Sequence, residues 1–207
     1  MKWDYEKQII VDKVREFHIY YNVPIRFYHD IEVSNMLFRR DLHREEFREW
    51  FIAENPVDEL DALCDMAYIA AGSMLELGIK CLKRNPDSLV NAQAHVETEL
   101  SNSEPCEKGI RGSLNVLLVS ILVEAEKQHF EFMDAFAEVH RTNMAKGWSD
   151  NDLLSISPTE KFLYFKRPPV VIVKRQDGKI LKPPSWKKPN LVPFIQPSML
   201  CQKSLKA

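Results

Sequence analysis

The sequence predicts an all-α protein that ends in a turn-rich tail. Apolar residues recur every three or four positions through most of the first 146 residues, which is the period of an α-helix. Eight of the twelve prolines then lie beyond residue 157, and proline breaks helices. With 207 residues and 45% hydrophobic content, the chain can bury one core of substantial size.

Two N-terminal helices are predicted from their apolar stripes. The first covers about residues 4–21 and ends before Pro24, because proline disfavours a helical residue ahead of it. Its stripe consists of Ile10, Val14, Phe17 and Tyr21. The second covers about residues 36–54 and stops at Asn55-Pro56. Its stripe consists of Phe38, Leu42, Phe47, Trp50 and Phe51.

A third helix is predicted to begin at Pro56 and to run to about residue 83. Asp58 and Glu59 lie in its first turn, where acidic residues face the positive end of the helix dipole. Residues 85–112 are polar and are expected to form an insertion with a short helix of its own. One long helix is then predicted over residues 113–146, with Gly147 as its stop.

The C-terminal part is expected to be a tail of turns that carries one small β-hairpin. The apolar segments 170–173 and 180–181 are joined through Asp177-Gly178, which is a typical hairpin turn. We therefore expect a helical domain over residues 1–148 and a proline-rich extension over residues 149–207 that is not an independent domain.

Bulk charge and cysteine usage exclude several classes of protein. The formal net charge of −2 implies no general attraction to nucleic acid or membranes, so a nucleic-acid binder would need a local basic patch. The four cysteines form no C-x-x-C pair, which argues against a zinc or redox motif. No apolar run approaches the roughly 20 residues of a membrane span. We expect a cytoplasmic protein with neither a nucleic-acid nor a membrane partner.

Two clusters of carboxylates lie on neighbouring predicted helices. Glu46 and Glu49 are one turn apart on the second helix, with Glu45 beside them. On the third helix, Asp61 and Asp65 continue a stripe that starts at Asp58. A short connection should make the two helices antiparallel, so that their acidic faces meet.

Facing carboxylates repel one another, and a divalent cation removes this repulsion. Ligands that are all oxygen, without Cys or His, favour a hard ion such as Mg²⁺ or Mn²⁺. Such ions bind phosphates and make bound water more acidic. The alternative for each stripe alone is a solvated helix face.

Several segments in order resemble the all-α nucleoside triphosphate pyrophosphohydrolases, in particular the MazG-like and phosphoribosyl-ATP-pyrophosphohydrolase-like proteins of bacteria and phages. Characteristic among them are Arg39-x-x-Leu42-x-x-Glu45-Glu46-x-x-Glu49 and Asp61-Ala62-Leu63-Cys64-Asp65. The matching segments are 14–18 with 22–24, 39–49, 61–68, 138–146 and 177–184. The resemblance implies a MazG-like helical bundle, and residues 85–112 and 149–169 would be insertions relative to short members.

The resemblance also implies roles for individual residues. Glu46, Glu49 and Asp65 would bind Mg²⁺, Asp61 would be a ligand or lie directly behind the ligands, and Glu45 would orient or deprotonate the attacking water. This family usually carries a Glu three residues before the last Asp, where this chain has Ala62, so the number of ligands is open. The substrate's triphosphate would be held by Lys146, Asn143 and Arg141, with Lys146 also stabilising the leaving pyrophosphate.

The reaction implied is hydrolysis of a (deoxy)nucleoside triphosphate to the monophosphate and pyrophosphate, by a homodimer or homotetramer. An HD-type phosphohydrolase is an alternative, with His29-Asp30, His18 and Asp61 as its site. A single Glu126-x-x-His129 motif falls short of the two such motifs that a di-iron bundle uses. From another class, a non-enzymatic helical interaction module would use the acidic stripes only for solubility.

Overall fold

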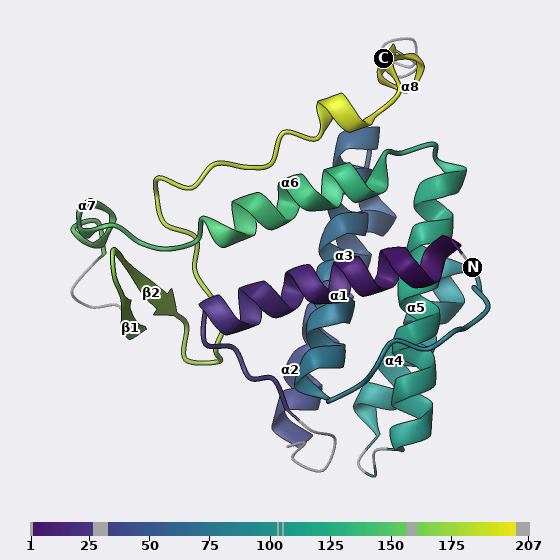
Figure 1. Ribbon diagram of the computed structural model, residues 1–207, viewed down its shortest axis with the longest axis horizontal. Helices are drawn as coiled ribbons and strands as arrows, with labels where there is room; N and C mark the ends of the chain where they lie inside the picture. The colour runs from purple at the N-terminus through teal and green to yellow at the C-terminus, as the bar shows by residue number, and fades with distance from the viewer. Residues whose placement is uncertain (1, 27–32, 103, 105, 157–160, 202–207) are drawn as a thin grey trace. The chain divides into compact units, whose positions relative to one another are not determined.

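The computed structural model describes residues 2–26, 33–102, 104, 106–156 and 161–201. Over these residues the chain is mostly helical and carries one small antiparallel sheet near the C-terminus, which confirms the predicted class (Figure 1). In order, the elements are α1 (Lys2–Tyr20), α2 (Val33–Ile52), α3 (Pro56–Glu76), α4 (Leu89–Ser101), α5 (Glu107–Lys127), α6 (Phe132–Met144), α7 (Asp150–Leu153), β1 (Leu163–Arg167), β2 (Val170–Lys174), η2 (Val192–Phe194) and α8 (Pro197–Cys201).

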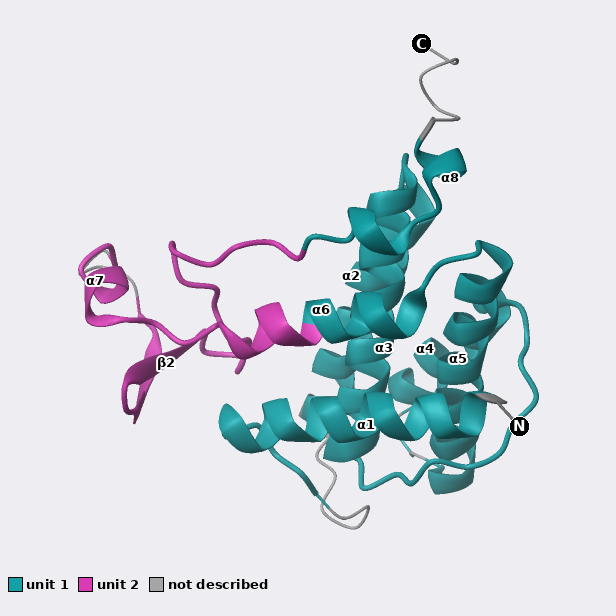
Figure 2. Cartoon of the chain, turned by 45° about the horizontal axis from the view of Figure 1, so that its top comes forward, with its two compact units in different colours: residues 1–139, 190–207 teal, residues 140–189 magenta. Residues whose placement is uncertain are grey.

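The chain divides into two compact units (Figure 2). The first unit contains residues 1–139 and 190–207, and the second contains residues 140–189. Helices α1 to α5 and the start of α6 belong to the first unit, whereas the end of α6, α7 and the sheet belong to the second.

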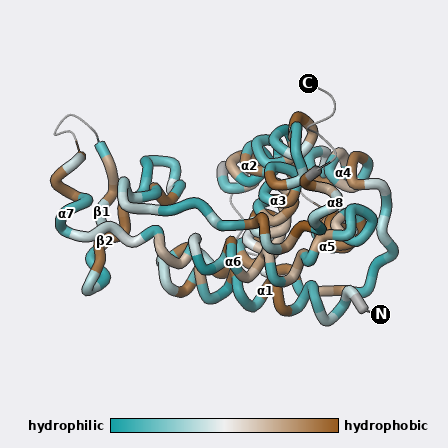
Figure 3. The backbone as a smooth tube through the Cα atoms, turned by 90° about the horizontal axis from the view of Figure 1, so that it is seen from above, coloured by the Kyte–Doolittle hydropathy of each residue, from teal (hydrophilic) through white to brown (hydrophobic). Residues whose placement is uncertain are grey.

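The core of the first unit is a bundle of two consecutive helical hairpins. Helix α2 packs against α3, and α4 packs against α5; the hairpins meet where α3 contacts α5 and α2 contacts α4. Helix α1 lies across α3 and α5 (Figure 1). Hydrophobic segments are prominent along α3 and α5, whose inner residues are buried (Figure 3). Among the described residues, no helix is both long and apolar enough to cross a membrane.

Helix α3 ends at Glu76, earlier than the predicted residue 83. Gly78 adopts a left-handed conformation with φ 64°, and Ile79 N donates to Met74 O at 2.7 Å. Gly78 N also donates to Leu75 O at 3.3 Å. This is the Schellman arrangement that terminates helices at glycine, so the chain turns away where the apolar pattern alone suggested continuation.

The expected insertion 85–112 contributes a full helix to the bundle. Helix α4 begins at an N-cap, where the Ser88 side chain accepts from Asn91 N, and it packs against both α2 and α5. Its buried side chains recur at helical spacing. They are Leu89, Ala92, Gln93, Val96 and Leu100.

The prediction of a single long helix over residues 113–146 is wrong. The structure has α5, which begins earlier at Glu107, and a separate α6. Between them His129 takes a left-handed conformation with φ 55°, and Phe130 N donates to Ala125 O at 3.0 Å. The chain therefore turns at 128–131 without a glycine or proline to signal it.

In the second unit, β2 forms where a strand was predicted, but its main partner differs. Strand β1 pairs with β2 in antiparallel register, from Leu163 opposite Lys174 to Arg167 opposite Val170. The predicted turn at Asp177-Gly178 exists, yet it supports only an isolated bridge between Lys174 and Ile180. The hairpin thus uses residues 163–167, which the sequence analysis did not assign to a strand.

Candidate metal and phosphate site

Buried polar contacts fix how α2 and α3 lie against each other. Arg39 on α2 makes two hydrogen bonds with the Glu76 carboxylate on α3, one of them 2.9 Å from Nε to Oε2. One turn further along α2, His43 Nε2 lies 3.1 Å from the Ser73 hydroxyl. Residue numbers rise on α2 as they fall on α3, so the two helices are antiparallel, as predicted.

This register places the predicted metal ligands in the half of the helix pair that does not contain the contact between Arg39 and Glu76. Continuing from His43 and Ser73 along both helices leads to Glu46 and Glu49 on α2 and to Asp65 and Asp61 on α3. Glu46, Asp61 and Asp65 are half-buried, whereas Glu49 is exposed. The four predicted metal ligands therefore lie in one half of the helix pair, away from Arg39 and Glu76.

Asp61 and Asp65 lie among buried neighbours. Leu60, Ala62, Leu63, Cys64, Met66 and Ala67 are all buried on the same helix. Burial, and then the charges of Asp65 and Asp61, hold the pKa of the Cys64 thiol well above its usual value. Cys64 is therefore a neutral core thiol, and the two carboxylates create a negative potential at an interior part of α3.

The acids themselves have partners. Glu45, Glu46, Asp61 and Asp65 each take part in interactions within the structure. The Glu46 Oε2 atom is shielded from solvent and accepts no hydrogen bond from the described residues. Among those residues no three His, Cys, Asp or Glu side chains converge closely enough to hold a metal ion, so the ligand set stays a prediction.

The histidines near the helix pair are neutral and serve packing. Burial first, and then the neighbouring Arg39, lower the pKa of His43 to about 3 and that of His18 to about 4. His18 Nδ1 lies 3.0 Å from Pro24 O, so the neutral ring donates there. The His18 Nε2 atom lies close to Gly72. A Cβ atom added at Gly72 would lie 3.2 Å from this nitrogen and 3.1 Å from the Arg39 guanidinium.

This surrounding does not suit His18 as a metal ligand in an HD-type site, because a guanidinium lies next to the ring nitrogen that would have to bind the cation. The central His29-Asp30 dipeptide of that alternative lies outside the described residues. Glu126 and His129 are both exposed at the end of α5.

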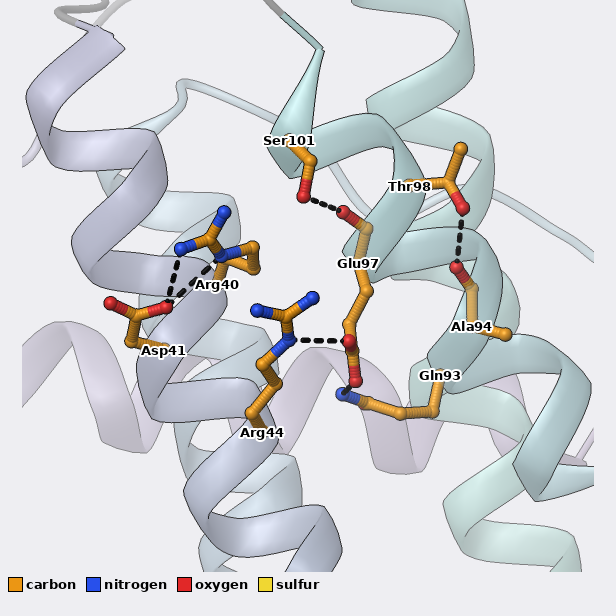
Figure 4. Close-up of polar contacts among 8 residues, drawn as sticks. All are labelled: Arg40, Asp41, Arg44, Gln93, Ala94, Glu97, Thr98 and Ser101. Carbon is orange, nitrogen blue, oxygen red and sulfur yellow. Dashed lines mark hydrogen bonds and ion pairs between the residues drawn. The ribbon is translucent and has the colours of Figure 1, made fainter.

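The opposite side of α2 faces a groove formed with α4 (Figure 4). Arg44 Nε donates to Glu97 Oε2 at 2.6 Å, and Gln93 Nε2 donates to Glu97 Oε1 at 3.1 Å. Glu46 lies two positions after Arg44, which is about 200° of helical rotation. The groove, with a volume of about 640 Å³, therefore lies away from the acidic face.

Comparisons with protein-family models, with curated protein sequences and with solved structures found no match for this chain. The assignment of a site consequently depends on the residues and their arrangement.

The predicted phosphate-binding residues belong to the second unit. Arg141 and Asn143 lie in the last turn of α6, and Lys146 follows it, with its backbone N donating to Asn143 O at 3.3 Å. Arg141 is exposed, Lys146 is half-buried and Asn143 is buried. The Trp186 indole donates to Thr142 O at 2.8 Å and so fixes this end of the helix within the unit.

Arg39, His43 and Ser73 are the positioning residues that sequence reasoning missed. A signal was present on α2, because Arg39, His43 and Glu46 follow one another at four- and three-residue steps and therefore share a face. Their partners Glu76 and Ser73 are more than 25 residues away along the chain, so only the fold reveals the pairing.

Proposed function

We propose that this protein is a Mg²⁺-dependent nucleoside triphosphate pyrophosphohydrolase with a MazG-like helical bundle. Its substrate would be a (deoxy)nucleoside triphosphate, hydrolysed to the monophosphate and pyrophosphate. The antiparallel register set by Arg39 and Glu76 supports this most, because Glu46, Glu49, Asp61 and Asp65 then lie in the same half of the helix pair.

The donor set suits a hard divalent ion. Glu46 and Glu49 from α2 and Asp65 from α3 would bind it, with Asp61 as a further ligand or directly behind them. Three of these four carboxylates are half-buried, and burying like charges together is costly unless a cation compensates them. Once bound, Mg²⁺ would polarise the phosphoryl group under attack and make its bound water more acidic; Mn²⁺ would be a substitute.

The remaining predicted residues supply acid–base and charge functions. Glu45 is exposed and lies directly before the proposed ligand Glu46. In the proposal, Glu45 orients the attacking water and accepts its proton. Lys146, with Asn143 and Arg141, is assigned to the triphosphate, where positive charge stabilises the leaving pyrophosphate. A water held at the α-phosphorus can then attack in line while pyrophosphate departs.

Product analysis tests this proposal directly. The purified protein is incubated with each dNTP and NTP and Mg²⁺, and the products are separated by ion-exchange chromatography. We expect the nucleoside monophosphate and pyrophosphate as the only products. Tripolyphosphate with a nucleoside would indicate HD-type chemistry, and a diphosphate with orthophosphate would indicate attack at the γ-phosphorus; either result rejects the proposed reaction.

A helical interaction module is the second candidate function. The observation in its favour is the apolar end of α2, where the side chains of Phe51 and Ile52 are 72% and 61% exposed. Such a module would hydrolyse none of the nucleotides and would gain no stability from Mg²⁺.

We also propose that the protein forms a homodimer or homotetramer. Light scattering after size-exclusion chromatography tests this oligomeric state.

A further inference from the structure

Charge is distributed very unevenly between the two units. Residues 140–189 contain eleven Lys and Arg and four Asp and Glu, for a net charge of +7. The rest of the chain contains 17 Lys and Arg and 26 Asp and Glu, for a net charge of −9. The near-neutral total therefore conceals the local basic region that a nucleic-acid binder would need.

Much of this positive charge is exposed on and around the hairpin. Lys161, Lys166, Arg167, Arg175 and Lys182 are exposed. Asp177 forms an ion pair with Arg175 and so offsets that cation. Asp152 is buried and accepts hydrogen bonds from Ser149 and Ser185, away from the exposed cations.

Strand β1 adds exposed aromatic rings to these cations. All five of its residues are exposed, including Tyr164 at 50% and Phe165 at 38%. Consecutive strand residues point to opposite faces, so each face of the strand presents one aromatic ring followed by one cation, Lys166 or Arg167. Lys174 Nζ lies 5.1 Å from the centroid of the Phe165 ring.

We infer that β1 and its flanking cations bind single-stranded nucleic acid. Exposed aromatic rings stack on unpaired bases, and interleaved Lys and Arg bind the phosphates of the same strand. A membrane-binding segment needs its apolar groups on one face, whereas Tyr164 and Phe165 lie on opposite faces. Lysine on an edge strand also prevents pairing between chains, but this role requires no exposed rings.

Binding is tested with the full-length protein by fluorescence anisotropy. The probe is a labelled single-stranded oligonucleotide of about 20 nucleotides, titrated in EDTA so that metal-dependent hydrolysis plays no part. We expect a dissociation constant in the range of about 1–100 µM near 50 mM salt, weakening steeply as salt increases.

Two double variants separate stacking from charge. Tyr164→Ala with Phe165→Ala should weaken binding about tenfold or more and leave the salt dependence unchanged. Lys161→Glu with Lys166→Glu should weaken binding and lower the slope of log affinity against log salt by about 1.4, since each phosphate contact on a single strand contributes about 0.7. All four side chains are exposed, and circular dichroism checks that the variants fold.

Matched controls come from the first unit. Tyr5→Ala with Phe51→Ala removes two exposed rings, and Lys83→Glu with Arg84→Glu reverses two exposed charges. Both controls should bind within about twofold of the parent. The inference is overturned if the parent does not bind, if the controls lose as much affinity as the hairpin variants, or if a duplex or phosphatidylserine vesicles bind more tightly than the single strand. Displacement of the oligonucleotide by micromolar tripolyphosphate would also overturn it.

Discussion

The two helical hairpins of the bundle are built alike but differ in their polar residues. Helices α3 and α5 each contain 21 residues and bury an apolar stripe. The buried polar residues of α5 are neutral: Ser113, Asn115 and Ser120. They hydrogen-bond to backbone groups; Asn115, for example, accepts from Leu82 N at 2.7 Å and donates to Lys80 O at 3.2 Å. On α3, by contrast, Asp61 and Asp65 are half-buried carboxylates one turn apart.

This difference shows what the bundle itself requires. Between Lys108 and Val123, helix α5 contains no acidic residue and still packs against both α3 and α4. Helix packing therefore does not need carboxylates in the middle of a helix. Glu97 on α4 is a half-buried carboxylate as well, so the α2–α3 hairpin differs in that Asp61 and Asp65 lie one turn apart on one helix. This spacing suits the proposed cation site.

The largest expected effect is on turnover. Glu46→Gln removes one ligand charge with little change in volume, so we expect hydrolysis to fall by about a hundredfold or more, because metal stabilisation of the transition state is worth several kcal/mol. The same applies to Asp65→Asn. Initial rates with a saturating nucleotide and Mg²⁺ measure this.

Glu97→Gln is the matched control, a half-buried glutamate on the other hairpin. It should retain turnover within a few-fold of the parent. If Glu46→Gln and Asp65→Asn behave like this control, the two hairpins do not differ in function and the proposed site is wrong.

The next effect concerns the ion pairs of α2. The pair between Arg39 and Glu76 is buried within the hairpin, with side-chain exposures of 6% and 11%. Arg39→Met leaves the Glu76 carboxylate buried without its cation, so we expect the free energy of unfolding to fall by about 3–5 kcal/mol. The pair between Arg44 and Glu97 joins the two hairpins and is more exposed, at 51% and 24%. Arg44→Met should cost about 0–1 kcal/mol.

Urea unfolding of both variants measures this difference. Equal losses of stability would show that the contact within the α2–α3 hairpin is no more important to the bundle than the contact between the hairpins.

Metal binding should have an intermediate effect on stability. A ligand that binds only the folded state at 100 times its dissociation constant adds about 2.7 kcal/mol. For a chain of this length, Mg²⁺ should therefore raise the melting temperature by roughly 5–10 °C. Differential scanning fluorimetry measures the shift, which Glu46→Gln should abolish and Glu97→Gln should preserve. An equal shift in all three proteins would mean that the ion binds elsewhere.

The sequence was informative about helices and much less so about where they end. Periodic apolar residues predicted α1 and α3 because burial of one face repeats with the turn of the helix. On α2 the helix was predicted but its buried face was not, because Met36, Arg39 and His43 are buried instead of the predicted apolar stripe. The break at His129 escaped prediction because neither glycine nor proline marks it, although its φ is 55°. The hairpin was assigned to Asp177-Gly178, a strong local signal, but β2 pairs mainly with β1 across Pro168-Pro169. A two-residue connection of prolines carries none of the Asn, Asp or Gly turn signals from which hairpins are predicted.

The candidate site, too, could be predicted from the sequence only in part. Short connections and acidic spacing were enough to predict that α2 and α3 are antiparallel neighbours with acidic stripes. The rotation of each helix could not be predicted, because it depends on contacts such as Arg39 with Glu76, which are 37 residues apart. The near-neutral net charge of the whole chain likewise did not reveal that residues 140–189 carry a net charge of +7.

The smallest predicted effect on stability per site is the pH dependence that each of two buried histidines imposes on the α2–α3 side of the bundle. The folded pKa values, about 4 for His18 and about 3 for His43, lie below the value of 6.5 for an unperturbed histidine, mainly because both rings are buried and then because Arg39 is near. Between pH 6.5 and 4 the unfolded chain therefore binds more protons than the folded one. The free energy of unfolding is highest above pH 6.5 and falls as the pH falls, by about 2 kcal/mol per histidine at pH 5. Urea unfolding at pH 7, 6 and 5 measures this slope, and His43→Gln, which keeps a side-chain amide beside the Ser73 hydroxyl, should flatten it. An unchanged slope in His43→Gln would show that this ring is not buried in its neutral form in solution, and that the contact aligning α2 with α3 differs from the one described.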